Sequence, residues 1–380
     1  MRFDRPVWIL ALLSLALGAC AGDKDVEPPA ELVDFDAKIG VQSVWSLSLG
    51  GGDEVLRVGL APTADGDRIY AAGRSGEVVA VQAATGRRLW RTRTELELTG
   101  GPGVGFGLVV VASTNGEVIA LDAASGERRW QVSIGSEVLS APAVAGDAVI
   151  VRTVAGSLLG LFPADGRVMW REDQQIPRLT LRGAATPAVS GTTAVCGFDN
   201  GRVLAVETGS GEVLWEQLVS PARGRTELER LVDIDSVLKV SEQDVFVAGY
   251  QGRVALLSLD SGQAWWSREL SSHRGLDVDA ERVYVSTSEG ELVALRRRSG
   301  IELWRQSGLR MRRLSAPAAI GAYVAVADFE GYVHWLDART GEFVARSSAG
   351  GRISNAPAAV GDLVVFQDDE GRVTALRPRG

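Results

Sequence analysis

The chain has 380 residues, of which 46% are hydrophobic and 23% are charged, and it contains 45 glycines. This is the composition of an ordered globular protein, which excludes disorder over most of the chain. The formal net charge of −8 argues against a general nucleic-acid binder, because such proteins normally present a basic face.

The first forty residues have the layout of an export signal followed by a linker. Two arginines precede an apolar run from Pro6 to Leu17, as in a secretory signal peptide. The sequence Leu17-Gly-Ala-Cys20 resembles the lipobox of bacterial lipoproteins, in which the chain is cut before the cysteine and the cysteine is acylated. We therefore expect a signal peptide over residues 1–19, lipid attachment at Cys20, and an acidic flexible tether over residues 20–40. An ordinary signal peptide that ends beside Cys20 by chance is the alternative.

From residue 41 onward the chain repeats one unit, whose clearest copy runs from Gly116 to Trp130. The leading glycines of the eight copies are Gly76, Gly116, Gly156, Gly201, Gly252, Gly290, Gly331 and Gly371. Their spacings of 40, 40, 45, 51, 38, 41 and 40 residues are typical of propellers with four-stranded blades. We therefore predict an all-β fold over residues 41–380, an eight-bladed β-propeller of four-stranded antiparallel blades.

Tryptophans recur at one phase of the repeat, four residues after the glycine of a tight turn. These residues are Trp90, Trp130, Trp170, Trp215, Trp266 and Trp304. Their fixed phase favours packing between blades over a base-stacking or cofactor role, because a buried indole covers a large area. The seventh unit has Ala345 at this position, and an additional strand around Trp45 precedes the first unit. We expect the strand around Trp45 to complete the last blade and close the ring.

Two spacings exceed the period, and in a repeat protein function tends to lie where the repeat is interrupted. The extra residues are 174–182 and 220–235, on consecutive units. Both connect an outer strand to the next inner strand, so both emerge on the same rim. They combine apolar and charged side chains, which is typical of a docking surface. The members we expect to contribute are Leu179, Leu181, Arg182, Arg230, Leu231, Asp233, Ile234 and Asp235. Longer solvated loops with buried apolar residues are the alternative.

The sequence offers no positive evidence for an enzyme. After removal of the signal peptide the histidines are His273 and His334, on different units, and Cys20 and Cys196 are far apart. No paired-cysteine metal or redox motif and no nucleophile elbow is present. We therefore expect no catalytic residue, no metal and no cofactor, and we place Cys196 in a strand core.

The repeat resembles a known family. The stretch Ala120 to Trp130 is similar to the tryptophan-docking repeat shared by pyrroloquinoline quinone enzymes and their non-enzymatic relatives. Those dehydrogenases carry an adjacent cysteine pair on a much longer chain, and no adjacent cysteines occur here. The lipobox, the tether and eight blades in so few residues instead resemble the BamB family, lipoprotein propellers of the outer-membrane β-barrel assembly machinery.

Two further stretches of the sequence support this resemblance. Leu179-Thr-Leu-Arg-Gly183 looks like the family's Leu-x-Leu-Arg-Gly loop, and residues 226–235 look like its second docking loop. The resemblance implies that these loops bind POTRA domains of BamA. The residues it implicates are Leu179, Leu181, Arg182, Asp233 and Asp235.

The resemblance also implies a cellular location and a set of partners. We expect a non-catalytic scaffold, lipid-anchored at the periplasmic face of the outer membrane, that works with the other assembly subunits and with unfolded outer-membrane protein clients. A quinone-dependent periplasmic dehydrogenase and a propeller scaffold of another envelope complex are the alternatives.

Overall fold

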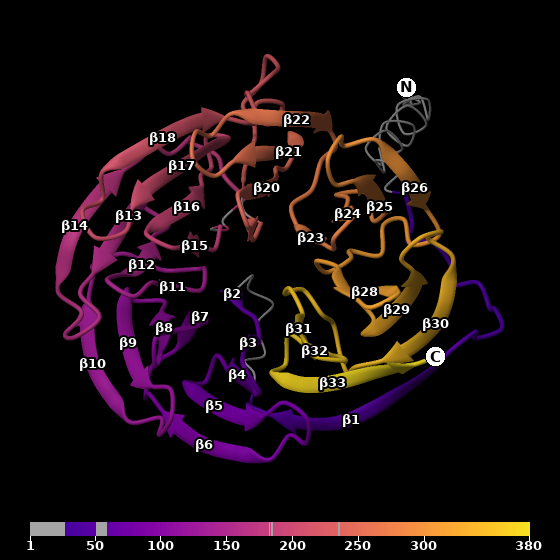
Figure 1. Cartoon of the computed structure of the whole chain (residues 1–380), viewed down its shortest axis with the longest axis horizontal. Helices are drawn as coiled ribbons and strands as arrows, with labels where there is room; N and C mark the ends of the chain where they lie inside the picture. Colours follow the sequence, from indigo (N-terminus) through magenta and orange to yellow (C-terminus); the bar gives the residue numbers. More distant parts are fainter. Residues whose placement is uncertain (1–26, 51–58, 182, 184, 235) are drawn as a thin grey trace, which may run out of the picture.

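The computed structural model describes residues 27–50, 59–181, 183, 185–234 and 236–380. The described residues form eight sheets arranged as blades around a central axis, and they include no helix (Figure 1). No helix long and apolar enough to cross a membrane occurs among them. The prediction of an all-β, eight-bladed propeller is confirmed.

In blades 1 to 7 the strands run outward from the axis in chain order, and in blade 8 the outermost strand is β1 (Figure 1). Blade 1 contains β3 (Thr63–Asp65), β4 (Arg68–Ala72), β5 (Glu77–Gln82) and β6 (Arg88–Arg93). Blade 2 contains β7 (Leu98–Gly105), β8 (Leu108–Ser113), β9 (Glu117–Asp122) and β10 (Arg128–Ser133), and blade 3 contains β11 (Ala143–Val144), β12 (Val149–Arg152), β13 (Ser157–Leu161) and β14 (Val168–Asp173). Blade 4 contains β15 (Ala188–Ser190), β16 (Thr193–Gly197), β17 (Arg202–Glu207) and β18 (Val213–Leu218).

The remaining blades repeat this order. Blade 5 contains β19 (Lys239–Ser241), β20 (Asp244–Ala248), β21 (Arg253–Ser258) and β22 (Ala264–Glu269). Blade 6 contains β23 (Leu276–Val278), β24 (Arg282–Ser286), β25 (Leu292–Arg296) and β26 (Glu302–Gln306), and blade 7 contains β27 (Ala318–Ile320), β28 (Tyr323–Ala327), β29 (Tyr332–Asp337) and β30 (Phe343–Ser348). Blade 8 contains β31 (Ala358–Val360), β32 (Leu363–Gln367), β33 (Arg372–Arg379) and β1 (Gly40–Ser48).

The core lies between neighbouring blades. The second and third strands of a blade are buried on both faces, as β9 shows with four consecutive buried residues from Val118 to Leu121. The outer strand β10 is mostly exposed, and Trp130 is its buried residue. This contrast arises because the inner strands are covered by the sheets on either side, whereas the outer strand faces solvent along one edge.

Blade 2 departs from the expected four strands because a fifth strand, β2 (Gly59–Leu60), pairs in parallel with β7. Glycines make this close approach possible. A Cβ on Gly59 would lie 2.3 Å from the Leu139 carbonyl oxygen, and one on Gly100 would lie 2.4 Å from that of Ser140. Backbone therefore packs directly on backbone near the axis.

A bulge places each outer-strand tryptophan. In blade 2, Arg128 pairs with Leu121 while Trp130 pairs with Ala120, so Arg129 is the extra residue. The same register shift occurs in blades 1 to 7. An inserted residue re-aims the side chain that follows it.

Each tryptophan then docks on the next blade. The Trp304 indole N–H donates to the carbonyl oxygen of Ala338 at 3.0 Å, and its ring lies against Gly341, where an added Cβ would come within 2.5 Å of the ring. The same pairing of indole and turn glycine recurs for Trp45 with Gly86, Trp90 with Gly126, Trp130 with Gly166, Trp170 with Gly211, Trp215 with Gly262, and Trp266 with Gly300. The assignment of these tryptophans to packing between blades agrees with this geometry.

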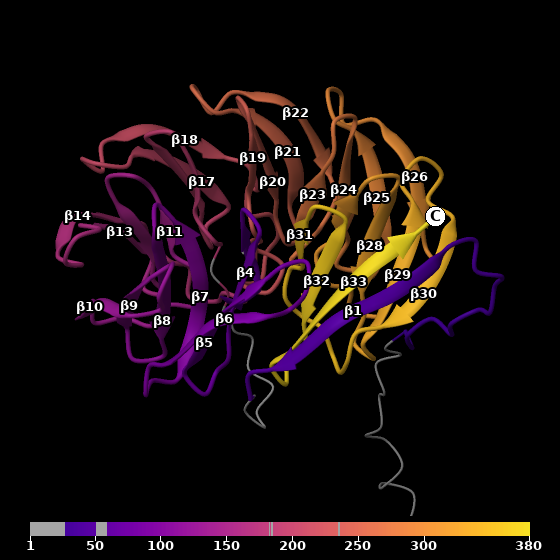
Figure 2. The same cartoon turned by 60° about the horizontal axis from the view of Figure 1, so that its bottom comes forward.

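The seam of the ring explains why blade 7 has Ala345 instead of a tryptophan. Strand β1 pairs antiparallel with β33, from Gly40 opposite Arg379 to Ser48 opposite Arg372 (Figure 2). The two outer strands of blade 8, β33 and β1, are therefore far apart in sequence, and among the described residues no tight turn joins them whose glycine could receive an indole. Ala345 is buried at this position.

Candidate docking surface

Two long connections interrupt the repeat, one between β14 and β15 and one between β18 and β19. We call them the first loop (residues 174–187) and the second loop (residues 219–238). Both leave an outer strand and enter the innermost strand of the next blade, so they emerge on one rim of the ring. Figure 1 shows the second loop projecting beyond β18 and β22.

The two loops are joined by a hydrogen bond. The backbone N–H of Leu181 donates to Oδ2 of Asp233 at 3.2 Å, across 52 positions of sequence. Asp233 is fully buried, and its carbonyl oxygen accepts from the N–H of Tyr250 at 2.7 Å in blade 5. Asp233 therefore ties the first loop to the second and the second loop to its blade.

The tip of the second loop is a single helical turn with a capping box. The N–H of Glu229 donates to Oγ1 of Thr226 at 3.1 Å, and the Glu229 carboxylate accepts from the N–H groups of Arg225 at 2.7 Å and Thr226 at 3.1 Å. These backbone N–H groups hold the pKa of Glu229 below its usual value. The turn is thus ordered locally, without burial.

This turn presents an apolar side chain to solvent. Leu228 is 65% exposed, although Leu231, three residues later, is 6% exposed. Sequence reasoning did not single out Leu228. The sequence did contain a signal for Leu228. It is a leucine within a run of charged residues, and a loop that only faces solvent does not need an apolar side chain there.

The first loop also presents apolar side chains. Leu179 is 41% exposed and Ile176 is 38% exposed, whereas Leu181 is half-buried. Exposed arginines flank the leucines of both loops: Arg178, Arg225 and Arg230. An apolar spot bordered by guanidinium groups suits a partner that offers apolar contacts and carboxylates.

Several expected surface residues lie elsewhere. Leu231, Asp233 and Ile234 are buried, so the expectation that their side chains form part of the exposed surface is wrong. Ile234 packs against Gly197, where an added Cβ would lie 2.4 Å from its Cγ2 atom, and joins the core between blades 4 and 5. Cys20, Arg182 and Asp235 lie outside the described residues.

The axis of the ring holds a cavity of about 390 Å³. Small residues of the innermost strands and their flanks line it, together with an ion pair of 3.1 Å between Lys239 and Asp277. Among the described residues, no three His, Cys, Asp or Glu side chains gather in a way that could hold a metal ion.

The two histidines lie in different environments. The Nδ1 atom of His273 is 3.2 Å from Oγ of Ser288. The His273 ring packs edge-on against the ring of Tyr250. His334 is fully buried, and its Nε2 is 2.9 Å from Oδ2 of Asp328, which also accepts from Nε of Arg312 at 2.7 Å. Burial lowers the pKa of His334, so the neutral ring donates to Asp328.

Comparison with known proteins gives one consistent family. A family model described as outer membrane protein assembly factor BamB matches residues 20–96, 74–306 and 294–379. The outer membrane protein assembly factor BamB of Pseudomonas aeruginosa is 52% identical over 339 residues, which cover 88% of this chain and 89% of the relative. That of Kangiella koreensis is 46% identical over 346 residues, covering 91% and 89%.

Solved structures agree. The crystal structure of BamB from Moraxella catarrhalis superposes with a TM-score of 0.80 at 32% identity, covering 89% of this chain and all of that chain (100%). A quinohemoprotein alcohol dehydrogenase from Comamonas testosteroni superposes with a TM-score of 0.70 at 14% identity, covering 89% of this chain and 76% of that one. The second likeness shows the fold alone.

Proposed function

The chain belongs to the family of the outer membrane protein assembly factor BamB, and on that premise we propose that it is a non-catalytic scaffold for the assembly of outer-membrane proteins. In this proposal Cys20 carries the lipid, the propeller lies at the periplasmic face of the outer membrane, and the two joined loops bind a POTRA domain of BamA. Its other partners are the remaining assembly subunits and unfolded outer-membrane protein clients.

The observation that supports the docking site is the hydrogen bond between Leu181 and Asp233, which unites the two loops in one surface. A loop that is held before binding loses less conformational freedom on binding, so the same contacts yield more affinity. Leu179 and Leu228 then supply apolar contacts to the partner, while Arg182 and Asp235 supply charges that set its register.

Asp233 has a different part in this surface. Because its side chain is buried, it is a positioning residue for the first loop and makes no direct contact with a partner. Asp233 therefore affects binding indirectly, because it fixes the conformation of residues 179–181.

The test is co-purification of the full-length, membrane-extracted chain with BamA. We expect Leu179→Ala combined with Arg182→Ala to abolish co-purification and to leave the melting temperature unchanged, because Leu179 is exposed. The matched control is Leu303→Ala combined with Arg339→Ala, which also removes an exposed leucine and an exposed arginine, from blades 6 and 7. Intact co-purification of the first variant would place the interface elsewhere.

A further inference from the structure

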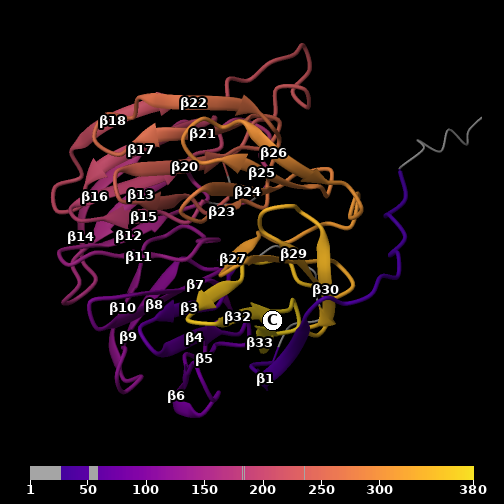
Figure 3. The same ribbon diagram turned by 45° about the vertical axis from the view of Figure 1, so that its right-hand side comes forward.

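The segment from Glu27 to Ile39 runs along the outside of blades 6 and 7 before β1 begins. We call it the strap. Figure 3 shows it as the indigo trace beside β30. The sequence predicted an acidic flexible tether over residues 20–40, and residues 27–39 of that segment make contacts with the propeller along their length.

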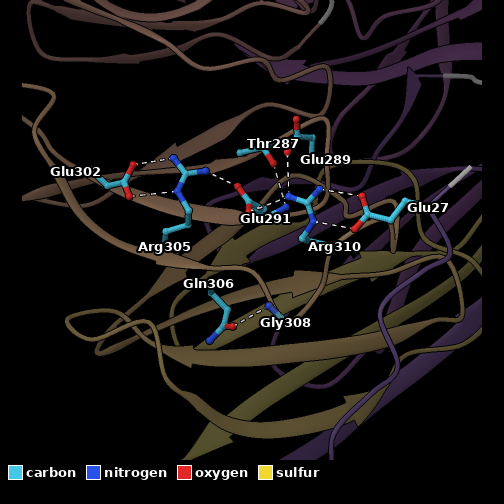
Figure 4. A network of polar contacts seen from close by, with 9 residues as sticks. All are labelled: Glu27, Thr287, Glu289, Glu291, Glu302, Arg305, Gln306, Gly308 and Arg310. Atoms are coloured by element: carbon cyan, nitrogen blue, oxygen red, sulfur yellow. Dashed lines mark hydrogen bonds and ion pairs between the residues drawn. The ribbon is translucent and has the colours of Figure 1, made fainter.

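The first contact is an arginine on the loop between blades 6 and 7. The Nε and Nη2 atoms of Arg310 reach the two carboxylate oxygens of Glu27 at 3.1 and 2.9 Å. Its Nη1 atom reaches Glu289 at 3.1 Å and Glu291 at 3.3 Å (Figure 4). The bidentate pair with Glu27 raises the pKa of Arg310, and three carboxylates hold this guanidinium in one orientation.

A buried arginine adds a second contact. Arg312 donates from Nη1 to the carbonyl oxygen of Ala30 at 3.0 Å, and from Nε to Asp328 at 2.7 Å. The N–H of Ala30 donates in turn to the carbonyl oxygen of Arg310 at 2.9 Å. Leu32 packs against the core shared by blades 6 and 7. The strap backbone is therefore bonded on both its donor and its acceptor side.

The strap continues down the outer strand β30. Nη2 of Arg346 donates to the carbonyl oxygen of Val33 at 3.1 Å, and the Phe35 ring stacks on Phe343 with a centroid distance of 5.7 Å. Lys38 pairs with Glu342 at 2.8 Å at the opposite rim. The strap thus crosses the full height of the ring, and Glu27 lies at the rim that carries the two docking loops.

We propose that the strap fixes the point at which the lipid anchor leaves the propeller, and thereby holds the rim of blades 6 and 7 next to the lipid surface. This inference rests on the proposed acylation of Cys20. Seven Cα steps separate Cys20 from Glu27, and a chain spans at most about 3.6 Å per residue, so Glu27 lies within about 25 Å of the acylated cysteine.

This arrangement also orients the docking surface. The second loop lies on the same rim, two blades away from the strap contact at Arg310. A partner held by the two loops is therefore presented on the membrane-facing rim, two to three blades around the ring from the strap contact.

The test uses the full-length acylated chain in phospholipid vesicles that contain a headgroup-labelled acceptor lipid. A donor dye is attached to one introduced cysteine at a time. Ser307→Cys lies on the strap rim of blade 6, Arg339→Cys lies on the opposite rim of blade 7, and Ser133→Cys lies on the strap rim of blade 2. The buried Cys196 does not compete for the dye, because burial raises its thiol pKa to about 12.

We expect the highest energy transfer from position 307. Release of the strap by Glu27→Ala with Phe35→Ala should abolish the difference between the three positions. The control Val33→Ala should retain it, because the side chain of Val33 is 76% exposed and the strap uses only its carbonyl oxygen. Equal transfer from all three positions in the unaltered strap, or an unchanged gradient after release, would overturn the inference.

Vesicle flotation separates this failure from failure of the proposed function. If the chain with native Cys20 does not float with the vesicles, the anchor itself is wrong. If it floats and the three donors report equal transfer, the anchor stands and the strap does not orient the propeller.

Discussion

The backbone N–H of Leu181 donates to the carboxylate of Asp233, and this bond of 3.2 Å joins loops from two consecutive blade junctions. Leu181 is half-buried and Asp233 is fully buried. The pair therefore belongs to the framework of the docking surface, and the exposed leucines around it are the groups available to a partner.

Asp233 should be sensitive to loss of its acceptor oxygen. We expect Asp233→Ala to lower the free energy of unfolding by about 1 kcal/mol, because the N–H of the half-buried Leu181 loses its partner, and to weaken BamA binding. Asp233→Asn keeps one acceptor oxygen and should retain more of both properties than Asp233→Ala. Urea unfolding and a pull-down measure the two effects, and equal losses in both variants would contradict the role given to the hydrogen bond.

Leu228 should contribute to binding and not to stability. It is 65% exposed at the tip of the second loop, so Leu228→Ala should change the free energy of unfolding by less than about 0.5 kcal/mol. Binding to BamA, measured by titration, should weaken, because Leu228 supplies an apolar contact in the proposed interface. The control is Leu214→Ala, which removes a leucine of 46% exposure from strand β18. Unchanged affinity for Leu228→Ala would remove the loop tip from the interface.

The contact between Trp304 and Gly341 should tolerate no side chain. Gly341 has a φ of +75°, and an added Cβ would lie 2.5 Å from the indole. Gly321 has a φ of +56° with nothing within 4 Å, so Gly321→Ala measures the backbone cost alone. We expect Gly341→Ala to be more destabilising than Gly321→Ala by about 1–3 kcal/mol, the usual cost of overpacking. Equal thermal shifts would show that the ring moves aside freely.

Stability should fall as the pH drops below the ordinary pKa of histidine. Burial lowers the pKa of His334 in the folded chain, so the unfolded chain binds a proton first and stability is lost from about pH 6.5 downward. Burial acts to raise the pKa of Asp328, but hydrogen bonds from His334 and Arg312 hold it below its usual value, so its contribution is lost at still lower pH.

Urea unfolding between pH 5 and pH 7 measures the first of these effects. The variant His334→Gln should show a smaller slope of unfolding free energy against pH than the native chain. The same slope in both chains would show that His334 does not govern this loss.

Cys196 should be inert in the folded chain. It is fully buried, and burial raises the pKa of its thiol to about 12, so the reactive thiolate is scarce at pH 8. Labelling by a thiol reagent should therefore proceed only as blades open, and its rate should follow the unfolding rate in added urea. Fast labelling without denaturant would indicate local opening of strand β16.

The repeat by itself determined the architecture. The glycine of each tight turn and the tryptophan four residues later are set by local backbone geometry, so their period is visible in one sequence and predicts both the number of blades and the packing between them. The same repeat period located the two loops, because a loop that lengthens the spacing between repeats is visible in the sequence without knowledge of its contacts.

Only the tertiary structure decided which loop residues face solvent. Ile234 is buried where it packs on Gly197, and the buried Asp233 accepts hydrogen bonds from Leu181 and Tyr250 that compensate for its burial. The structural reason for the alanine at position 345 and the docking of the strap on Arg310 likewise depend on segments from distant parts of the chain. Such contacts join residues tens to hundreds of positions apart, and no local pattern of side chains specifies which distant residue will be the neighbour.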